Sequence, residues 1–307
     1  MKLIASGTVN GGASKPLSWP EAYGEDAGPR LGFFTDTSVC IGCKACEVAC
    51  KEWNLVPEDG LDWTGDSLDN SQELSAETWR HVAFVEQQAP LRLEDGIATL
   101  SADGGAVEGE GFRWLMESDV CKHCTHAGCL DVCPTGALFR TEFGTVVVQE
   151  DVCNGCGYCV PACPFGVLTK RHLPDPARGG KEDGRVWKCT LCYDRTRDGI
   201  EPACAKACPT DSIQFGPLDE LRERADARLE KLQGEGWNGA QLYGRDPDGP
   251  VGGFGAFFLL LDKPETYGLP PDPVDPTTHL GECWRAALAA GATIVAGVAL
   301  AFLGGRS

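Results

Sequence analysis

The sequence predicts an α+β fold whose interior is organised by cysteines, and three observations lead to this prediction. First, 16 of the 17 cysteines fall into four short runs. Second, the gaps between the runs hold short segments with strand-like alternation and turn residues. Third, a helical repeat and a long uncharged segment follow the last run. The runs, in chain order, are Cys40, Cys43, Cys46 and Cys50; Cys121, Cys124, Cys129 and Cys133; Cys153, Cys156, Cys159 and Cys163; and Cys189, Cys192, Cys204 and Cys208.

The spacing inside these runs is typical of iron–sulfur ligands. Runs one and three read C-x2-C-x2-C-x3-C, run two reads C-x2-C-x4-C-x3-C, and run four reads C-x2-C-x11-C-x3-C. In such a run the first three cysteines can hold one iron–sulfur cube, while the fourth is a ligand of a neighbouring cube. Sixteen thiolates in four quartets therefore predict four [4Fe–4S] clusters and a role in electron transfer.

Two other uses of cysteine are weaker alternatives. Structural zinc also takes C-x2-C pairs, but it does not require triplets at two-residue steps followed by C-x3-C. Disulfide networks belong to small secreted domains, and no secretory signal is visible at the start of this sequence. The remaining cysteine, Cys283, lies outside every run and is expected to be a free thiol.

The gaps between the runs predict how they pair. A short hairpin-like link with a strand over 145–148 joins runs two and three, similar to that of a two-cluster bacterial ferredoxin. Run one is separated from run two by 70 residues, so it is expected to pair with run four. The expected ligand sets are Cys40, Cys43, Cys46 and Cys208; Cys50, Cys189, Cys192 and Cys204; Cys121, Cys124, Cys129 and Cys163; and Cys133, Cys153, Cys156 and Cys159.

The sequence predicts two ferredoxin-like modules, each binding two clusters, with additions around them. A strand from Trp79 to Val85 suggests a small β-containing lobe in the insertion, with a surface loop of no role as the equal alternative. Leucines from Leu218 to Leu232 follow a helical period that Gly234 ends, and 257–261 is expected to be a buried strand. The expected organisation is an extended arm over 1–35, the double iron–sulfur domain over 36–216 with its insertion 51–120, a helix-strand extension over 217–284, and an anchor over 285–307.

The end of the sequence predicts a single transmembrane helix. Residues 286–305 carry no charge, and about 20 apolar residues match a hydrocarbon core about 30 Å thick. Trp284, Arg285 and Arg306 flank the segment and suit the membrane interface. One arginine at each end favours neither orientation. A soluble alanine-rich helix packed on a partner is the alternative.

Charge and missing motifs exclude several function classes. The formal charge of −18 argues against binding to nucleic acid, because phosphates require lysine and arginine. No Walker A loop, nucleotide fingerprint or recognisable nucleophile–base pair is found, so no catalytic site is expected on this chain. His123 and His126 lie inside run two, where all the cysteine positions are filled, and are expected to form hydrogen bonds, to pack or to tune a cluster.

These residues together resemble a known family. The pattern of four runs is similar to that of the iron–sulfur subunits of molybdenum- and tungsten-pterin oxidoreductases. Residues 180–216 and 251–273, followed by the anchor, resemble the β subunit of membrane-bound respiratory formate dehydrogenase. The resemblance extends from about Gly32 to the end of the sequence.

The resemblance implies a division of labour among subunits. A separate catalytic subunit would oxidise formate at a bis-pterin molybdenum or tungsten centre, and this chain would relay the electrons through four cubes. A membrane cytochrome b subunit beside 286–305 would pass them to quinone, with the cluster domain on one side of the cell membrane. By the family's pattern, runs one and four face the catalytic subunit and runs two and three face the membrane. The alternatives are the equivalent subunit of another pterin enzyme or of a hydrogenase, and a free-standing polyferredoxin or metal-stabilised scaffold.

Overall fold

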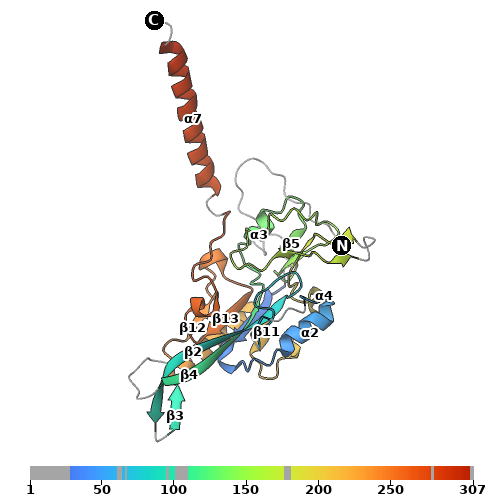
Figure 1. The fold of residues 1–307 in the computed structure, drawn as a ribbon, viewed down its shortest axis with the longest axis vertical. Helices are drawn as coiled ribbons and strands as arrows, with labels where there is room; N and C mark the ends of the chain where they lie inside the picture. The colour runs from blue at the N-terminus through green and yellow to red at the C-terminus, as the bar shows by residue number, and fades with distance from the viewer. Residues whose placement is uncertain are drawn as a thin grey trace.

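The computed structural model describes residues 28–60, 64–65, 68–94, 97–100, 110–175, 181–277 and 280–304. Most of the expected N-terminal arm and most of the acidic stretch 95–111 therefore lie outside the described residues. Helices and strands are both present, as the α+β prediction requires. Figure 1 shows a body of short strands and helices from which one long helix extends.

The largest sheet joins strands from opposite ends of the described chain. Its order is β11-β1-β13-β12, with β1 at Leu31–Asp36, β11 at Ile213–Pro217, β12 at Gln241–Tyr243 and β13 at Ala256–Leu260. β1 is antiparallel to β11 and parallel to β13, which is antiparallel to β12. Because β1 contains residues 31–35, the boundary predicted at residue 35 falls inside a strand of this sheet.

The core of this sheet lies along β13. Every residue of β13 is fully buried, and the rings of Phe34 and Phe257 stack with their centroids 5.3 Å apart. Helix α6 (Leu218–Gly234) packs on β1 and β11 and buries Leu218, Leu221, Ala225 and Leu232. This spacing of three and four residues is that of one helix face, so the predicted helical period and its end at Gly234 are confirmed. The buried strand expected at 257–261 is β13.

Antiparallel strand pairs bring distant cysteine runs together. Run one follows β1 after the short 3-10 helix η2 (Thr37–Val39), and run four ends just before β11. Since Thr35 pairs with Ile213, the end of β1 meets the start of β11, and the two runs lie side by side. Helix α2 (Ala45–Asn54), which contains the end of run one, packs on α5 (Ala203–Lys206) of run four.

Runs two and three are joined by a hairpin. β5 (Leu138–Arg140) pairs with β6 (Val146–Val148), which confirms the hairpin-like link and the strand expected near 145–148. The short helix α3 (Gly128–Asp131) lies within run two. β7 (Thr169–Lys170) pairs with β10 (Val186–Trp187) and connects the end of run three to the start of run four. The remaining elements are β8 (Pro174–Asp175), β9 (Lys181–Glu182), α4 (Tyr193–Arg197), η4 (Pro250–Gly252) and η5 (Pro264–Tyr267).

The segment between runs one and two contains a three-stranded sheet. Its order is β3-β2-β4, with β2 at Arg80–Glu94, β3 at Ile97–Leu100 and β4 at Glu110–Val120. The strand expected at 79–85 is the first part of the longer β2. In Figure 1 this sheet reaches to the lower end of the molecule. Its other end returns to the cysteines, because Arg80 pairs with Val120, the residue before Cys121.

Helix α7 (Leu280–Gly304) contains residues 286–304 of the uncharged segment and begins before it. It is long and apolar enough to cross a membrane, and none of its most apolar stretch is buried against the rest of the chain. Figure 1 shows it projecting from the end of the body that carries α3 and β5. The segment just before it is fastened there, because the Thr277 hydroxyl donates to the Asp131 carboxylate of α3 at 2.9 Å.

Replacing Phe257 by alanine is expected to destabilise the protein strongly. The ring is fully buried and stacked on Phe34, and such a truncation costs about 3–5 kcal/mol of the free energy of unfolding. The midpoint of denaturant unfolding of the full-length chain measures the loss. Val274→Ala at an exposed site is the control and should change the free energy by less than about 0.5 kcal/mol; equal effects of the two substitutions would contradict the packing described.

Candidate metal centres

All 17 cysteines lie in the described residues, and all are free thiols. Sixteen of them belong to the four runs, and Cys283 is an exposed free thiol on α7, as expected. With no disulfide in this part of the chain, the disulfide framework considered as an alternative has no support. The question is therefore whether the sixteen thiols are arranged in groups that suit iron–sulfur cubes.

The first expected quartet lines one cavity. Cys40, Cys43 and Cys46 of run one face Cys208 of run four across a space that is closed by residues such as Pro209 and Ser118. Burial raises the pKa of the Cys40 thiol, a backbone N–H from Gly42 lowers it, and the thiolates of Cys46, Cys208 and Cys43 raise it. Like charges raise one another's pKa only at close range, so these four sulfurs are neighbours.

The second quartet also combines runs one and four. Burial raises the pKa of Cys50 well above its usual value, and the next largest causes are the thiolates of Cys189, Cys204 and Cys192. The side-chain amide of Asn54 donates to the sulfur of Cys50 at 3.6 Å and to that of Cys192 at 3.8 Å. Run four therefore contributes three members of this quartet and run one contributes a single member.

Runs two and three form the remaining quartets. Burial raises the pKa of Cys124, and the thiolates of Cys121, Cys129 and Cys163 raise it further. Burial likewise raises the pKa of Cys159 to about 11, with Cys133, Cys153 and Cys156 as the neighbouring charges. The thiolates that act on Cys40, Cys50, Cys124 and Cys159 are thus, in each case, the other members of the group expected from the sequence.

The arrangement suits cubes better than single ions. No group of three or more Cys, His, Asp or Glu side chains in the described ranges is spaced to hold one metal ion. Tetrahedral zinc would draw its thiolates to about 2.3 Å from one centre, whereas a four-iron cube holds its thiolates further apart. Four quartets of neighbouring thiols, one of them around a cavity, fit [4Fe–4S] clusters.

All four loops share one backbone feature. The residue before the second cysteine of each run has a left-handed conformation, with φ of 64° at Gly42, 45° at His123, 72° at Gly155 and 57° at Leu191. Glycine adopts this conformation readily, but histidine and leucine do so at an energetic cost. The shared turn bends each loop around its own quartet, and the rest of the chain must hold it in place.

Run two shows how a strained loop is held. Arg30 donates to the His123 carbonyl at 2.9 Å and to the Thr125 hydroxyl at 2.7 Å. Arg140 donates to the carbonyl of Cys124 at 2.8 Å and to that of Thr125. The fully buried imidazole of His123 accepts a hydrogen bond from the Val146 N–H at 3.1 Å, so the hydrogen-bonding interpretation of this histidine is confirmed.

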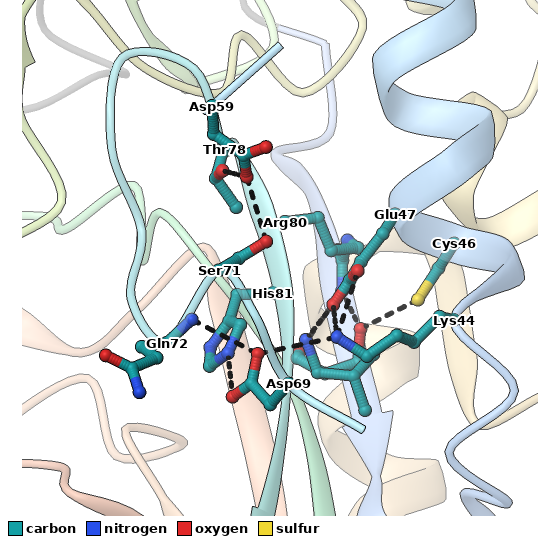
Figure 2. Close-up of polar contacts among 12 residues, drawn as sticks. Lys44, Cys46, Glu47, Asp59, Asp69, Ser71, Gln72, Thr78, Arg80 and His81 are labelled. Carbon is teal, nitrogen blue, oxygen red and sulfur yellow. Dashed lines mark hydrogen bonds and ion pairs between the residues drawn. The ribbon is translucent and has the colours of Figure 1, made fainter. Parts of the chain in front are cut away.

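A polar network fastens the 51–120 segment to run one. Figure 2 shows Glu47 of α2 beside Lys44, and Asp69 between Lys44 and His81. The Nζ of Lys44 lies 3.2 Å from Oε1 of Glu47 and 3.5 Å from Oδ1 of Asp69. The other carboxylate oxygen of Asp69, Oδ2, lies 2.6 Å from Nε2 of His81. Glu47 also accepts a hydrogen bond from the Val82 N–H. These contacts hold the start of β2, with Arg80, against the cysteines of run one.

The comparisons with known proteins assign the cysteine runs to iron–sulfur domains. The family described as "4Fe-4S dicluster domain" matches residues 39–137 and, in a second form, residues 112–218. The iron–sulfur subunit of the nitrate-inducible formate dehydrogenase of Escherichia coli K12 is 39% identical over 274 residues, which cover 88% of this chain and 81% of the relative. This chain belongs to the family of formate dehydrogenase iron–sulfur subunits.

Other relatives of this iron–sulfur subunit extend the comparison. The formate dehydrogenase iron–sulfur subunit of Haemophilus influenzae is 40% identical over 83% of the chain and 73% of the relative. The B subunit of the anaerobic dimethyl sulfoxide reductase of Escherichia coli K12 is 36% identical over 64% of the chain and 77% of the relative. Four [4Fe–4S] clusters in an electron-transfer subunit are consistent with the two dicluster matches, which overlap over residues 112–137.

Some residues that shape the sites could not be recognised in the sequence. Gly42 and Gly155 are glycines inside cysteine loops and could have been noticed as turn positions. His123 and Leu191 adopt the same backbone conformation without a glycine, so their sequence gives no signal. Arg80 is distant in sequence from every cysteine run and is still buried beside them.

Replacing Arg140 by leucine is expected to lower the free energy of unfolding by about 1–3 kcal/mol, because the carbonyls of Cys124 and Thr125 lose their donor. The midpoint of thermal unfolding of the full-length chain measures the effect. Arg224→Leu is the matched control, since that exposed side chain makes a surface ion pair, with 3.7 Å between its Nη2 and Oε2 of Glu220. Indistinguishable midpoints for the two variants would contradict the role of Arg140 in holding run two.

Proposed function

We propose that this subunit relays electrons released by formate oxidation on a separate catalytic subunit, through four [4Fe–4S] clusters, to a membrane cytochrome b and quinone. The catalytic subunit would carry a bis-pterin molybdenum or tungsten centre. The observation that carries the proposal is that cysteines of successive expected quartets act on one another's pKa, which supports a single series of four quartets. Electron hopping requires such a series of close neighbours.

Three contacts between quartets support the order of the series. The Cys204 thiolate is among the charges that raise the pKa of Cys46, which supports contact between the two quartets of runs one and four. Burial raises the pKa of Cys189 to about 12, and the Cys121 thiolate is the largest of the charges that add to it. Burial raises the pKa of Cys129 to about 12 as well, and Cys159 is among the thiolates that raise it.

In this proposal each quartet is the ligand set of one cube. The series begins with Cys40, Cys43, Cys46 and Cys208, continues with Cys50, Cys189, Cys192 and Cys204 and then with Cys121, Cys124, Cys129 and Cys163, and ends with Cys133, Cys153, Cys156 and Cys159. Each run lends one cysteine to the cube of its partner run. Two modules of two cubes follow, with the 51–120 segment inserted in the first of them.

The two ends of the series are the exposed ones. Cys43 in the first quartet and Cys156 in the last are the exposed cysteines of the four runs. Apolar side chains lie beside them, since Ile41 is 58% exposed and Tyr158 is 63% exposed. The two ends of the series would thus be the places where electrons enter and leave, while the four cysteines of the second quartet are all buried.

The position of α7 supports a direction for the series. Its base is fastened to α3 by the bond between Thr277 and Asp131, and α3 lies within run two. If α7 spans the cell membrane as a single helix, the quartets of runs two and three lie nearer to the bilayer. The cytochrome b and quinone would then be at that end, and the catalytic subunit would dock at the end of runs one and four.

The relatives support formate over other substrates. Relatives named as formate dehydrogenase subunits match 83–88% of the chain, whereas a dimethyl sulfoxide reductase subunit matches 64%. The proposed organisation keeps the arm before β1, the double iron–sulfur domain, the extension after residue 217 and the membrane helix as its parts. Because β12 and β13 pair with β1, the extension is part of the same sheet as the first module.

The proposal is tested on the complex purified anaerobically from membranes. Formate should reduce an added dye and should also generate the electron paramagnetic resonance signals of reduced [4Fe–4S] clusters. Iron and acid-labile sulfide assigned to this chain should each be about sixteen per chain, after subtraction of the catalytic subunit's share and of the haem iron of the cytochrome b. About twelve would mean that one quartet is not filled, and no reduction by formate would reject formate as the electron source.

Cross-sharing between runs gives a second test. Cys43→Ala and Cys208→Ala, in runs far apart in sequence, should abolish the same cluster signal, because both cysteines belong to the first quartet. Cys192→Ala, in the same run as Cys208, should abolish a different signal. Cys283→Ala is the control and should leave all four signals intact. Loss of one common signal in Cys192→Ala and Cys208→Ala would reject the cross-shared ligand sets.

A further inference from the structure

Arg80 is a buried cation with no complete set of partners in the protein. It is the first residue of β2 and is only 2% exposed. Its Nη1 donates to the Ser118 carbonyl at 3.1 Å and to the Ser118 hydroxyl at 3.0 Å. Its Nε and Nη2 are also buried and find no acceptor in the part of the chain that the structure describes. An arginine carries N–H donors at all three nitrogens, so donors on two of them lack an acceptor.

The surroundings of Arg80 supply sulfur instead of oxygen. Burial lowers the pKa of Arg80, and the thiolates of Cys204, Cys46, Cys189 and Cys50 outweigh that effect and raise it. Two of these cysteines, Cys46 and Cys50, also have their own pKa lowered by Arg80. The four cysteines belong to two different quartets. Arg80 lines one cavity with Cys50 of the second quartet, and the Ser118 hydroxyl that accepts from it lies 3.2 Å from the sulfur of Cys46 in the first quartet. Arg80 therefore lies where the first and second quartets adjoin.

Two further contacts fix the orientation of the side chain. The guanidinium lies over the ring of Phe33, with 5.0 Å between its carbon and the ring centroid. A guanidinium that packs against an aromatic face keeps its N–H groups, which lie in its own plane, available for hydrogen bonds. Ser118, which holds Nη1, also has its hydroxyl 3.2 Å from the sulfur of Cys46. The serine thus connects the arginine to the first quartet.

Another buried cation near the cysteines shows what is unusual about Arg80. Lys188 is equally buried, but its ammonium donates to the carbonyls of Val146 and Cys189. Two of the three donors of the Lys188 ammonium are used by backbone carbonyls, whereas Nε and Nη2 of Arg80 have no acceptor in the described residues. A planar guanidinium that lies between two groups of sulfur ligands and has spare N–H donors can donate hydrogen bonds to both groups.

We propose that Arg80 tunes two clusters together: its spare N–H groups donate to sulfur atoms of the cubes held by the first and second quartets, and its charge raises both reduction potentials. Hydrogen bonds to cluster sulfur and nearby positive charge stabilise the reduced, more negative form. The inference rests on the ligand sets of the proposed function. It gives the 51–120 segment a role, because this segment supplies Arg80 to a pair of cubes whose ligands all come from elsewhere.

Potentiometric titration followed by electron paramagnetic resonance tests the inference in the purified complex. Arg80→Gln removes the charge and should move the potentials of two of the four clusters to more negative values, leaving the other two unchanged. Arg80→Lys keeps the positive charge but lacks the planar set of N–H donors of the guanidinium, so the same two potentials should move less. The matched control is Arg113→Gln on the neighbouring strand β4, where the side chain pairs with Asp262 and Gln87; it should move none.

Iron analysis separates the failure of this inference from the failure of the proposed function. Wild-type protein without about sixteen irons on this chain would overturn the ligand sets themselves. With full iron content, unchanged potentials in Arg80→Gln, or equal shifts in all four clusters, would overturn the role of Arg80 alone. If Arg80→Gln does not retain its clusters, Arg80→Lys decides: two altered potentials support the inference, and four wild-type potentials reject it.

Discussion

The constraint on which this structure depends is the gathering of sixteen thiols, seven of them buried, in one small protein. Burial makes each thiol harder to ionise, and neighbouring thiolates add to the cost, as the raised pKa values of Cys50, Cys124 and Cys189 show. Ligation by iron removes the thiol protons and supplies the compensating charge. The protein supplies further positive charge through cations buried near the sulfurs, among them Arg80 and Lys188. This explains why a chain with a formal charge of −18 keeps positive charges in its interior.

The second requirement is that segments far apart in sequence meet at each quartet. The pairing of β1 with β11 brings runs one and four together, and the β5–β6 hairpin brings runs two and three together. Hydrophobic packing makes these pairings rigid, since β13 is fully buried beside β1 and α6 covers β1 and β11. The candidate metal sites and the hydrophobic core are therefore built on the same strands. A substitution that disturbs the core packing is thus expected to shift the cysteines as well.

The sequence was sufficient for those features that depend on spacing. The quartets follow from cysteine spacing and gap length, α6 from its leucines, and α7 from the absence of charge over 286–305. It was insufficient where function depends on a contact made through folding. Arg80 is an ordinary strand residue until β2 pairs with β4 beside run two, and the loop conformation of Leu191 is imposed by its surroundings. Likewise, nothing in residues 31–36 alone shows that β1 lies between β11 and β13 in the main sheet.

The arrangement of the main sheet has a consequence for the biogenesis of the protein. During synthesis the hairpin of β5 and β6 can close as soon as both runs that it joins have emerged, because it is local in sequence. β1 emerges much earlier but has to wait for β11 and β13, which are made near the end of the chain. Domains tend to fold as their parts leave the ribosome, and here the first part made is among the last to be completed. On this order of synthesis, runs two and three can come together before run one meets run four.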